Sequence, residues 1–175
     1  MRFLGRILVS GSVASIASAL AAALCSRAEN RHAARPINAI AHIYDGGRPP
    51  AADGRARRNT ALGFGIHTAA SLWWALFFEA LPRRWRNEAG AAAVSAMAYF
   101  VDYHVVHRRF RPGFERHLSP ASRASIYLAL AAGFAAAGRL DRRLDDHEVE
   151  DGDEGHKRRN TQRRPGRVKA PEALR

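Results

Sequence analysis

The sequence is poor in cysteine and contains long stretches without charge. Cys25 is the single cysteine, so neither an intramolecular disulfide nor a multi-cysteine metal site can form. Four stretches lack Asp, Glu, Lys and Arg altogether: residues 7–25, 61–78, 89–101 and 124–138. Charged residues crowd between and after them. Because this alternation is typical of membrane proteins, the sequence predicts an all-α, polytopic helical membrane protein.

Motifs of common enzyme classes are also missing. The sequence has no Gly-rich phosphate loop, no nucleophile elbow and no zinc-protease helix motif. We therefore predict that the protein is not an enzyme, and we predict no cofactor.

The apolar stretches predict four transmembrane helices within a membrane domain over residues 1–138. The run 7–25 would form a helix of about 28 Å, close to the thickness of the hydrocarbon core. The segment 61–81 is the strongest candidate, because its large apolar side chains favour insertion. The segments 89–106 and 122–138 are rich in alanine, and small residues let helices approach closely in lipid.

The connections add three expectations. Residues 36–44 (PINAIAHIY) are apolar enough for a short interfacial helix. Residues 82–88 are so short that the second and third spans must form an antiparallel hairpin, with Trp85 as an interfacial anchor. Basic residues are balanced between the two faces, so the orientation stays open. Residues 1–25 fit either a retained span, which their length favours, or a cleaved signal.

The region from residue 139 to 175 differs completely from the rest. An acidic block, 141–154, holds eight carboxylates, and residues 157–169 hold seven basic residues and no acid. This composition predicts a disordered, charged C-terminal tail.

Ionisable residues inside a span are costly, so His67 and Asp102 require an explanation. In a hairpin centred on Trp85, His67 lies level with Asp102 and Tyr103, near the face that carries the 26–60 loop. We predict that His67 and Asp102 meet in an intramembrane polar site, with Tyr103, Thr60 and His42 nearby. Such a pair is either a polar clasp between helices, a proton relay or two ligands of a metal.

Three other ionisable residues have simpler explanations. Glu79 lies four residues before Arg83, where an ion pair accounts for it. His104 and His107 are spaced as one edge of a metal site, but beside Arg108 and Arg109 they fit solvated interface residues better. Metal binding thus has only weak candidates: His67, Asp102, His104 and His107.

Three stretches carry a family resemblance: NAIAHIYDG (38–46), RNTALGFGIHTAASLWWALFFEAL (58–81) and DYHVVHRRFRPGFERHLS (102–119). They resemble a set of small uncharacterised bacterial inner-membrane proteins, over roughly residues 38–138. The resemblance implies an inner-membrane, multi-pass location and no activity. The family pattern has proline where this chain has His107, which speaks against a metal site there.

Three functions fit these observations. The first is a small structural or accessory membrane protein whose polar residues serve packing. The second is a proton- or metal-handling membrane protein that uses His67 and Asp102. The third is a peripheral basic protein that binds nucleic acid or anionic lipid through residues 157–169, although the adjacent acidic block makes nucleic acid a poor partner. The thin, Ala-rich spans also predict a homo-oligomer or a larger membrane partner beside the lipid bilayer.

Overall fold

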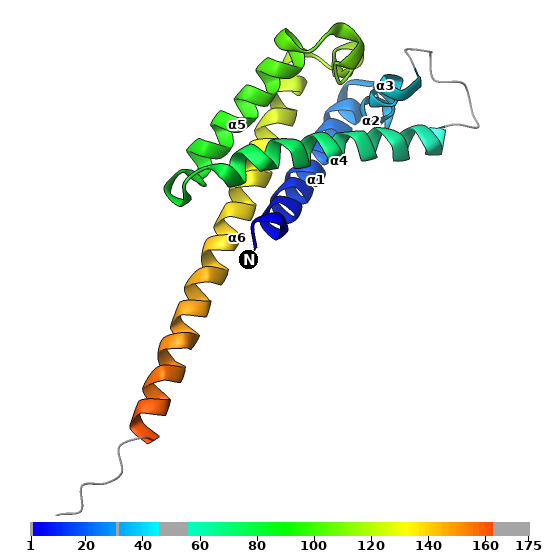
Figure 1. Ribbon diagram of the computed structural model, residues 1–175. Helices are drawn as coiled ribbons and strands as arrows, with labels where there is room; N and C mark the ends of the chain where they lie inside the picture. Colours follow the sequence, from blue (N-terminus) through cyan, green and yellow to red (C-terminus); the bar gives the residue numbers. More distant parts are fainter. Residues whose placement is uncertain (1, 31, 46–55, 163–175) are drawn as a thin grey trace, which may run out of the picture. The chain divides into compact units, whose positions relative to one another are not determined.

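Helices and short connections make up the whole described part of the computed structural model, which covers residues 2–30, 32–45 and 56–162. The long helices are α1 (Phe3–Asn30), α4 (Ala56–Ala80), α5 (Glu88–Phe100) and α6 (Pro120–Gln162). Two short helices, α2 (Arg35–Ile40) and α3 (His42–Asp45), follow α1 (Figure 1). The all-α prediction is confirmed for these residues, which include no strand.

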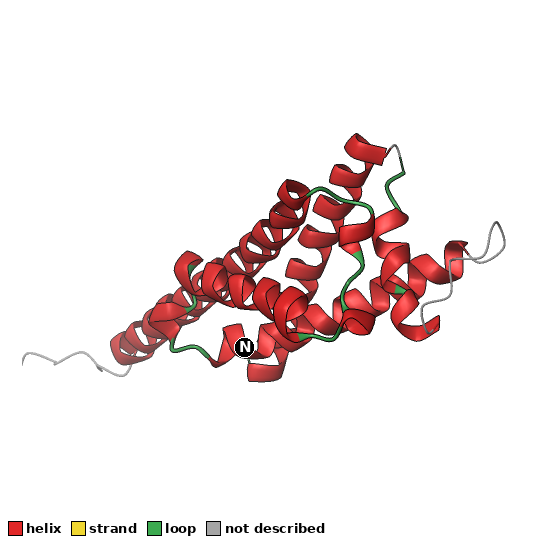
Figure 2. Ribbon diagram, turned by 90° about the horizontal axis from the view of Figure 1, so that it is seen from above, coloured by secondary structure: helices red, strands yellow, loops and turns green. Residues whose placement is uncertain are grey.

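The chain divides into two units, residues 1–139 and 140–175, and α6 begins in the first and ends in the second. In the first unit α1 crosses α4, and α5 runs beside the first part of α6 (Figures 1 and 2). Contacts far apart in sequence fix the directions: Arg6 meets Glu79 and Ser18 meets His67, so α1 and α4 are antiparallel. Asp102 meets Tyr127 and Glu88 meets Arg139, so α5 and α6 are also antiparallel.

Small side chains allow the closest helix contacts. A Cβ added to Gly133 of α6 would overlap the backbone of Ala14 in α1, and one added to Gly11 would lie 2.9 Å from the Leu72 Cα in α4. Such close approach is the usual packing mode of helices in lipid, where small residues replace the large side chains of soluble cores. Phe78 of α4 and Phe134 of α6 stack at 5.3 Å and fill the interior beside these contacts.

The hairpin between α4 and α5 turns through a 3₁₀ helix, Arg83–Trp85. Asn87 then caps α5, its side-chain oxygen accepting hydrogen bonds from the backbone N–H groups of Ala89 and Gly90. Trp85 is 51% exposed. The tight antiparallel connection predicted for 82–88 is therefore present.

Two of the four predicted spans meet the length and hydropathy of a transmembrane helix: Phe3–Glu29 and Arg57–Ala80. The third apolar segment is divided, because α5 ends at Phe100 and a π-helical segment, Val101–Val105, follows. The fourth has too short a run of apolar residues, mostly alanine, before Arg139. Length and composition thus support two spans, and four remains a proposal.

Two further expectations differ from the structure in detail. The predicted interfacial helix 36–44 is broken at Ala41 into α2 and α3. The predicted tail, 139–175, is helical as far as Gln162, because α6 continues through the acidic block. Acidic and basic residues three or four positions apart in this stretch are compatible with a helix. Residues 163–175 lie outside the described residues.

Candidate functional site

The candidate site is a small cavity where α1, α4, α5 and α6 come together. Its accessible volume is about 40 Å³, and both His67 and Asp102 line it. Its other polar lining residues are Ser18, Ser71 and Tyr127, and Trp74, Phe114, Ile126 and Leu130 supply most of the apolar wall. The two residues that the sequence singled out therefore share one cavity.

His67 and Asp102, which the sequence analysis predicted to meet, line the same cavity but form hydrogen bonds with residues of other helices. The Nε2 atom of His67 lies 3.0 Å from the Ser18 Oγ atom in α1. The Oδ2 atom of Asp102 accepts a hydrogen bond of 2.7 Å from the Tyr127 hydroxyl in α6. The prediction considered only the α4–α5 hairpin, whereas side chains from α1 and α6 supply the nearer partners.

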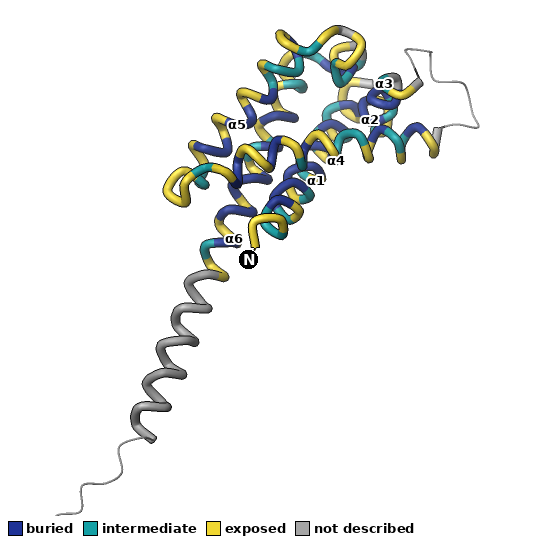
Figure 3. The backbone as a smooth tube through the Cα atoms, viewed as in Figure 1, coloured by how far each residue is buried: buried dark blue, intermediate teal, exposed yellow. Residues whose placement is uncertain are grey.

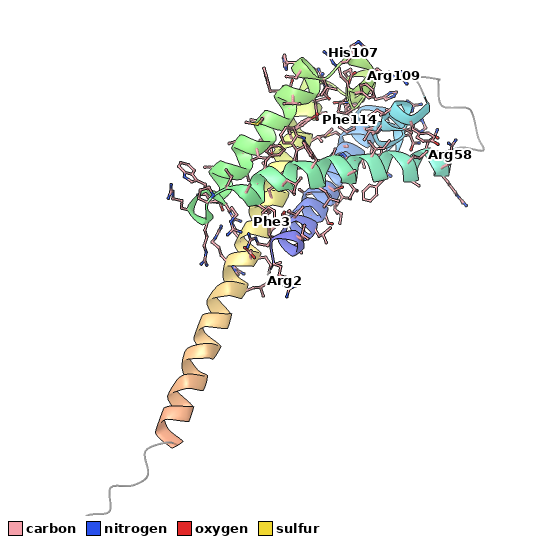
Figure 4. All side chains as sticks on the ribbon, in the orientation of Figure 1. Arg2, Phe3, Arg58, His107, Arg109 and Phe114 are labelled. Atoms are coloured by element: carbon pink, nitrogen blue, oxygen red, sulfur yellow. The ribbon has the colours of Figure 1, made fainter. Side chains whose placement is uncertain are left out.

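The His67 side of the cavity is built by α1. Ser15 and Thr68 share a hydrogen bond of 2.9 Å one turn away from the Ser18–His67 contact. The Phe114 ring, from the 3₁₀ helix Phe114–Arg116, packs edge-on against the His67 imidazole at 6.4 Å. Figure 4 draws Phe114 beneath the loop that carries His107 and Arg109. These contacts fix the orientation of the imidazole from two sides.

The Asp102 side is built by a group of tyrosines. Asp102 belongs to the π-helical segment, whose wider turn changes the helical phase that an α-helix would give. Tyr99, Tyr103 and Tyr127 contact one another with ring centroids 5.0–6.2 Å apart. The Arg123 guanidinium lies over the Tyr103 ring at 5.3 Å. A cation and a carboxylate therefore both contact this group of tyrosines.

The remaining predicted site residues lie elsewhere. Tyr103 is buried in the tyrosine group but does not line the cavity. Thr60 donates a hydrogen bond of 2.6 Å to the Asn38 Oδ1 atom, joining α4 to α2. The His42 backbone belongs to α3, and its side chain lies outside the described part of the structure.

The weak metal candidates are not brought together. His104 is exposed and stacks on Phe100 at 5.0 Å, and the exposed His107 caps its own turn through a hydrogen bond from the Arg109 N–H. Within residues 2–30, 32–45 and 56–162, no three His, Cys, Asp or Glu side chains group in a way that could hold a metal ion.

Two polar contacts outside the cavity escaped the sequence analysis. The buried Glu79 carboxylate accepts hydrogen bonds from Arg6 at 3.1 Å and from Arg86 at 3.2 Å. The Glu29 carboxylate accepts hydrogen bonds from the Ser119 N–H and hydroxyl and from the Ser122 hydroxyl, at the start of α6. One sequence signal could have indicated a partner that was missed. Small residues recur at a regular spacing in α1, as described below, and Ser18, the partner of His67, is one of them.

Comparison of the chain with known protein families, curated proteins and solved structures finds no match. The family resemblance therefore stays a prediction.

Proposed function

We propose that the protein is a small multi-pass membrane protein with a structural or accessory role, and that α1, α4, α5 and the first part of α6 lie within the inner membrane. The observation that carries this proposal is the inverted pattern of α1. Apart from Ile7, its buried residues are small, and those at every fourth position are at most 1% exposed: Ser10, Ala14, Ser18, Ala22 and Ser26. Its outward face carries Leu4, Leu8, Ile16, Leu20 and Leu24, which are 51–72% exposed.

This pattern is the reverse of a helix from a water-soluble protein, in which large apolar side chains face the core. In lipid the outward leucines lie in a solvent as apolar as themselves, and small inward residues permit close packing. α4 follows this rule only in part: Trp73 and Phe77 are 58% and 44% exposed and Ser71 and Ala75 are buried, but its buried face also carries the large Trp74 and Phe78. Figure 3 marks both faces along α1 and α4.

The structural role is supported by how the interior polar groups are paired. Ser15 with Thr68, Ser18 with His67, and Asp102 with Tyr127 each join two different helices. Glu79 joins α4 to α1 through Arg6. Such contacts stabilise a bundle in lipid by about 0.6–2 kcal/mol each, and they need no catalytic purpose.

Four spans are the arrangement we propose, although α5 alone is short. Its 13 residues extend about 20 Å, less than the hydrocarbon core of about 30 Å. The π-helical segment continues it to Val105. With four spans the amino terminus and the 82–88 turn share one face of the membrane.

Carbonate extraction of membranes that contain the expressed chain tests this proposal. We expect the protein to stay in the pellet at alkaline pH, and reagents that cannot cross the membrane to label cysteines at positions 2 and 84 from the same side, in a Cys25→Ser background. Release into the supernatant would overturn the membrane assignment. A basic protein that is released and then binds nucleic acid or anionic vesicles would support the third function instead.

A second candidate function is proton handling by His67 and Asp102. The shared cavity favours it, because an imidazole and a carboxyl group face the same small volume without bonding to each other directly. This second function predicts proton flux into proteoliposomes that contain a pH dye. It also predicts that Asp102→Asn and His67→Gln each abolish the flux. The matched control is Glu88→Gln, a change at an exposed carboxylate. Flux equal to that of empty liposomes would eliminate this function and leave the structural one.

A further inference from the structure

The cavity between His67 and Asp102 has unmatched hydrogen-bonding capacity. We assign the ring proton of His67 to Nε2, because the Ser18 hydroxyl donates its hydrogen to the Ala14 carbonyl at 2.7 Å and its Oγ atom, 3.0 Å from Nε2, is then an acceptor. The Ser71 hydroxyl likewise donates to the His67 carbonyl at 2.9 Å. The serine hydrogens are thus directed to backbone oxygens, and the serine oxygens are acceptors.

The imidazole and the carboxylate each keep one acceptor. With Nε2 carrying the proton, the Nδ1 atom of His67 has a lone pair. Asp102 receives the Tyr127 hydrogen at Oδ2, and no other described residue donates to its Oδ1 atom. Both residues line the same cavity, so a hydrogen-bond donor placed there can serve both acceptors. A buried acceptor left without a donor costs about 1–3 kcal/mol.

Water fits this requirement better than a metal ion does. A cavity needs about 10–15 Å³ of accessible volume to hold one water molecule, and this one has about 40 Å³. One water supplies two hydrogens and two further lone pairs. A metal ion would find only Nδ1 and Oδ1 as ligands from nitrogen and carboxylate donors, short of the usual four or more.

We propose that this cavity is a hydration site, in which ordered water bridges the His67 Nδ1 atom to the Asp102 Oδ1 atom. This water would connect two groups of hydrogen bonds. On one side lie the pairs Thr68–Ser15 and Ser18–His67, and on the other side lies the pair Asp102–Tyr127. This inference rests on the membrane bundle proposed above, but not on proton transfer, since a bridging water also serves a purely structural site.

Tyr127 defines the boundary of this site. It lines the inner cavity, and it also lines an outer groove of about 310 Å³ between α5 and α6, together with Ser95, Tyr99 and Leu128. Among the residues that the structure describes, no other lines both spaces. The Ser95 Oγ atom in the groove is buried and has no hydrogen-bond partner among the described residues. The phenol ring of Tyr127 thus separates the bridging water from the groove.

Magnetic resonance of the full chain in lipid, labelled with ¹⁵N-histidine, tests the bridging water. We expect magnetisation transfer from water to the His67 ring, whose signal the His67→Gln variant identifies by its loss. Ala98→Leu fills the cavity, since Ala98 is 1% exposed and lines it, and should abolish the transfer. Ala93→Leu, on an exposed position of the same helix, should leave it unchanged.

Carbonate retention of each sample separates the two proposals. A retained, helical wild-type protein without water transfer to His67 would overturn the hydration site and leave the membrane assignment intact. If Ala98→Leu does not fold, Ala98→Val provides the smaller filling and should weaken the transfer; transfer undiminished in a folded filling variant would also overturn the site.

The boundary role has its own measurement, exchange of the His67 ring N–H with D₂O. Tyr127→Ala should speed this exchange severalfold, whereas Tyr127→Phe keeps the ring and should not. Leu130→Ala is the matched control, because Leu130 lines the cavity on the same helix but not the groove. Equal exchange in Tyr127→Ala and Leu130→Ala would overturn the assignment of Tyr127.

Discussion

The contact of α1 with α4 and the contact of α5 with α6 are built by opposite means. In the first, glycine and serine bring two backbones together, and short side chains exchange hydrogen bonds across the gap, as Ser15 does with Thr68. In the second, tyrosine rings fill the space between the helices, and hydrogen bonds join Tyr127 to Asp102 and Arg139 to Glu88. Where two backbones touch, a larger side chain cannot be accommodated. Where rings lie between the helices, stability depends on single groups such as the Tyr127 hydroxyl.

The largest expected effect comes from enlarging a residue at a backbone contact. Gly133→Leu would drive a side chain into the Ala14 backbone, and because neither helix can yield locally, the cost should exceed the ~1–3 kcal/mol of ordinary overpacking. We expect no folded bundle, measured by protease resistance in detergent. Gly65→Leu is the control, since a Cβ there meets nothing within 4 Å. Equal sensitivity in both variants would contradict the role of this contact.

The next effect concerns the buried carboxylate that joins α1 to α4. Glu79→Ala leaves Arg6 and Arg86 without their shared partner, and the Glu79 side chain is only 3% exposed. We expect a loss of about 3 kcal/mol in the free energy of unfolding, as for other buried pairs that lose one member.

Glu88→Ala serves as its comparison, because Glu88 and Arg139 are 57% and 60% exposed. An exposed pair contributes at most about 1 kcal/mol. Denaturation in mixed micelles, followed by tryptophan fluorescence, measures both variants. A smaller loss for Glu79→Ala than for Glu88→Ala would show that the Arg6 contact does not hold the bundle together.

A smaller effect is expected on the tyrosine side. Tyr127→Phe keeps the ring contacts with Tyr99 and Tyr103 but removes the hydrogen bond to Asp102. The loss should be about 1–3 kcal/mol, because a buried carboxyl group loses its donor. The double variant Tyr127→Phe, Asp102→Asn should not be less stable than Tyr127→Phe alone. Additive losses would mean that the two residues act independently.

The smallest effect is expected for the exposed histidines. His104→Ala and His107→Ala should change stability by no more than about 0.5 kcal/mol, and zinc should not raise the melting temperature of the wild type more than that of the double variant. A zinc-dependent shift lost in the double variant would restore these residues as metal ligands.

The all-α prediction is confirmed for the described residues, because long charge-free runs are typical of apolar helices. Only two of the four predicted spans have the length and hydropathy of a membrane helix. The sequence also predicted that His67 and Asp102 lie at one level, because the 82–88 connection leaves the α4–α5 hairpin little freedom. The partners Ser18 and Tyr127 were missed, since helical phase gives the direction of a side chain but not which helix lies there. The π-helical segment at Asp102 was missed for a related reason: nothing in VDYHV distinguishes a wider turn from an α-helix.

The contact between Gly133 and Ala14 also constrains the order of assembly. During synthesis α1 emerges first, and the segment that carries Gly133 emerges more than a hundred residues later. The inward face of α1 therefore lacks its last neighbour while α4 and α5 are being synthesised. Until then the Ala14 surface is uncovered, so all residues before Gly133 are synthesised before this contact can form.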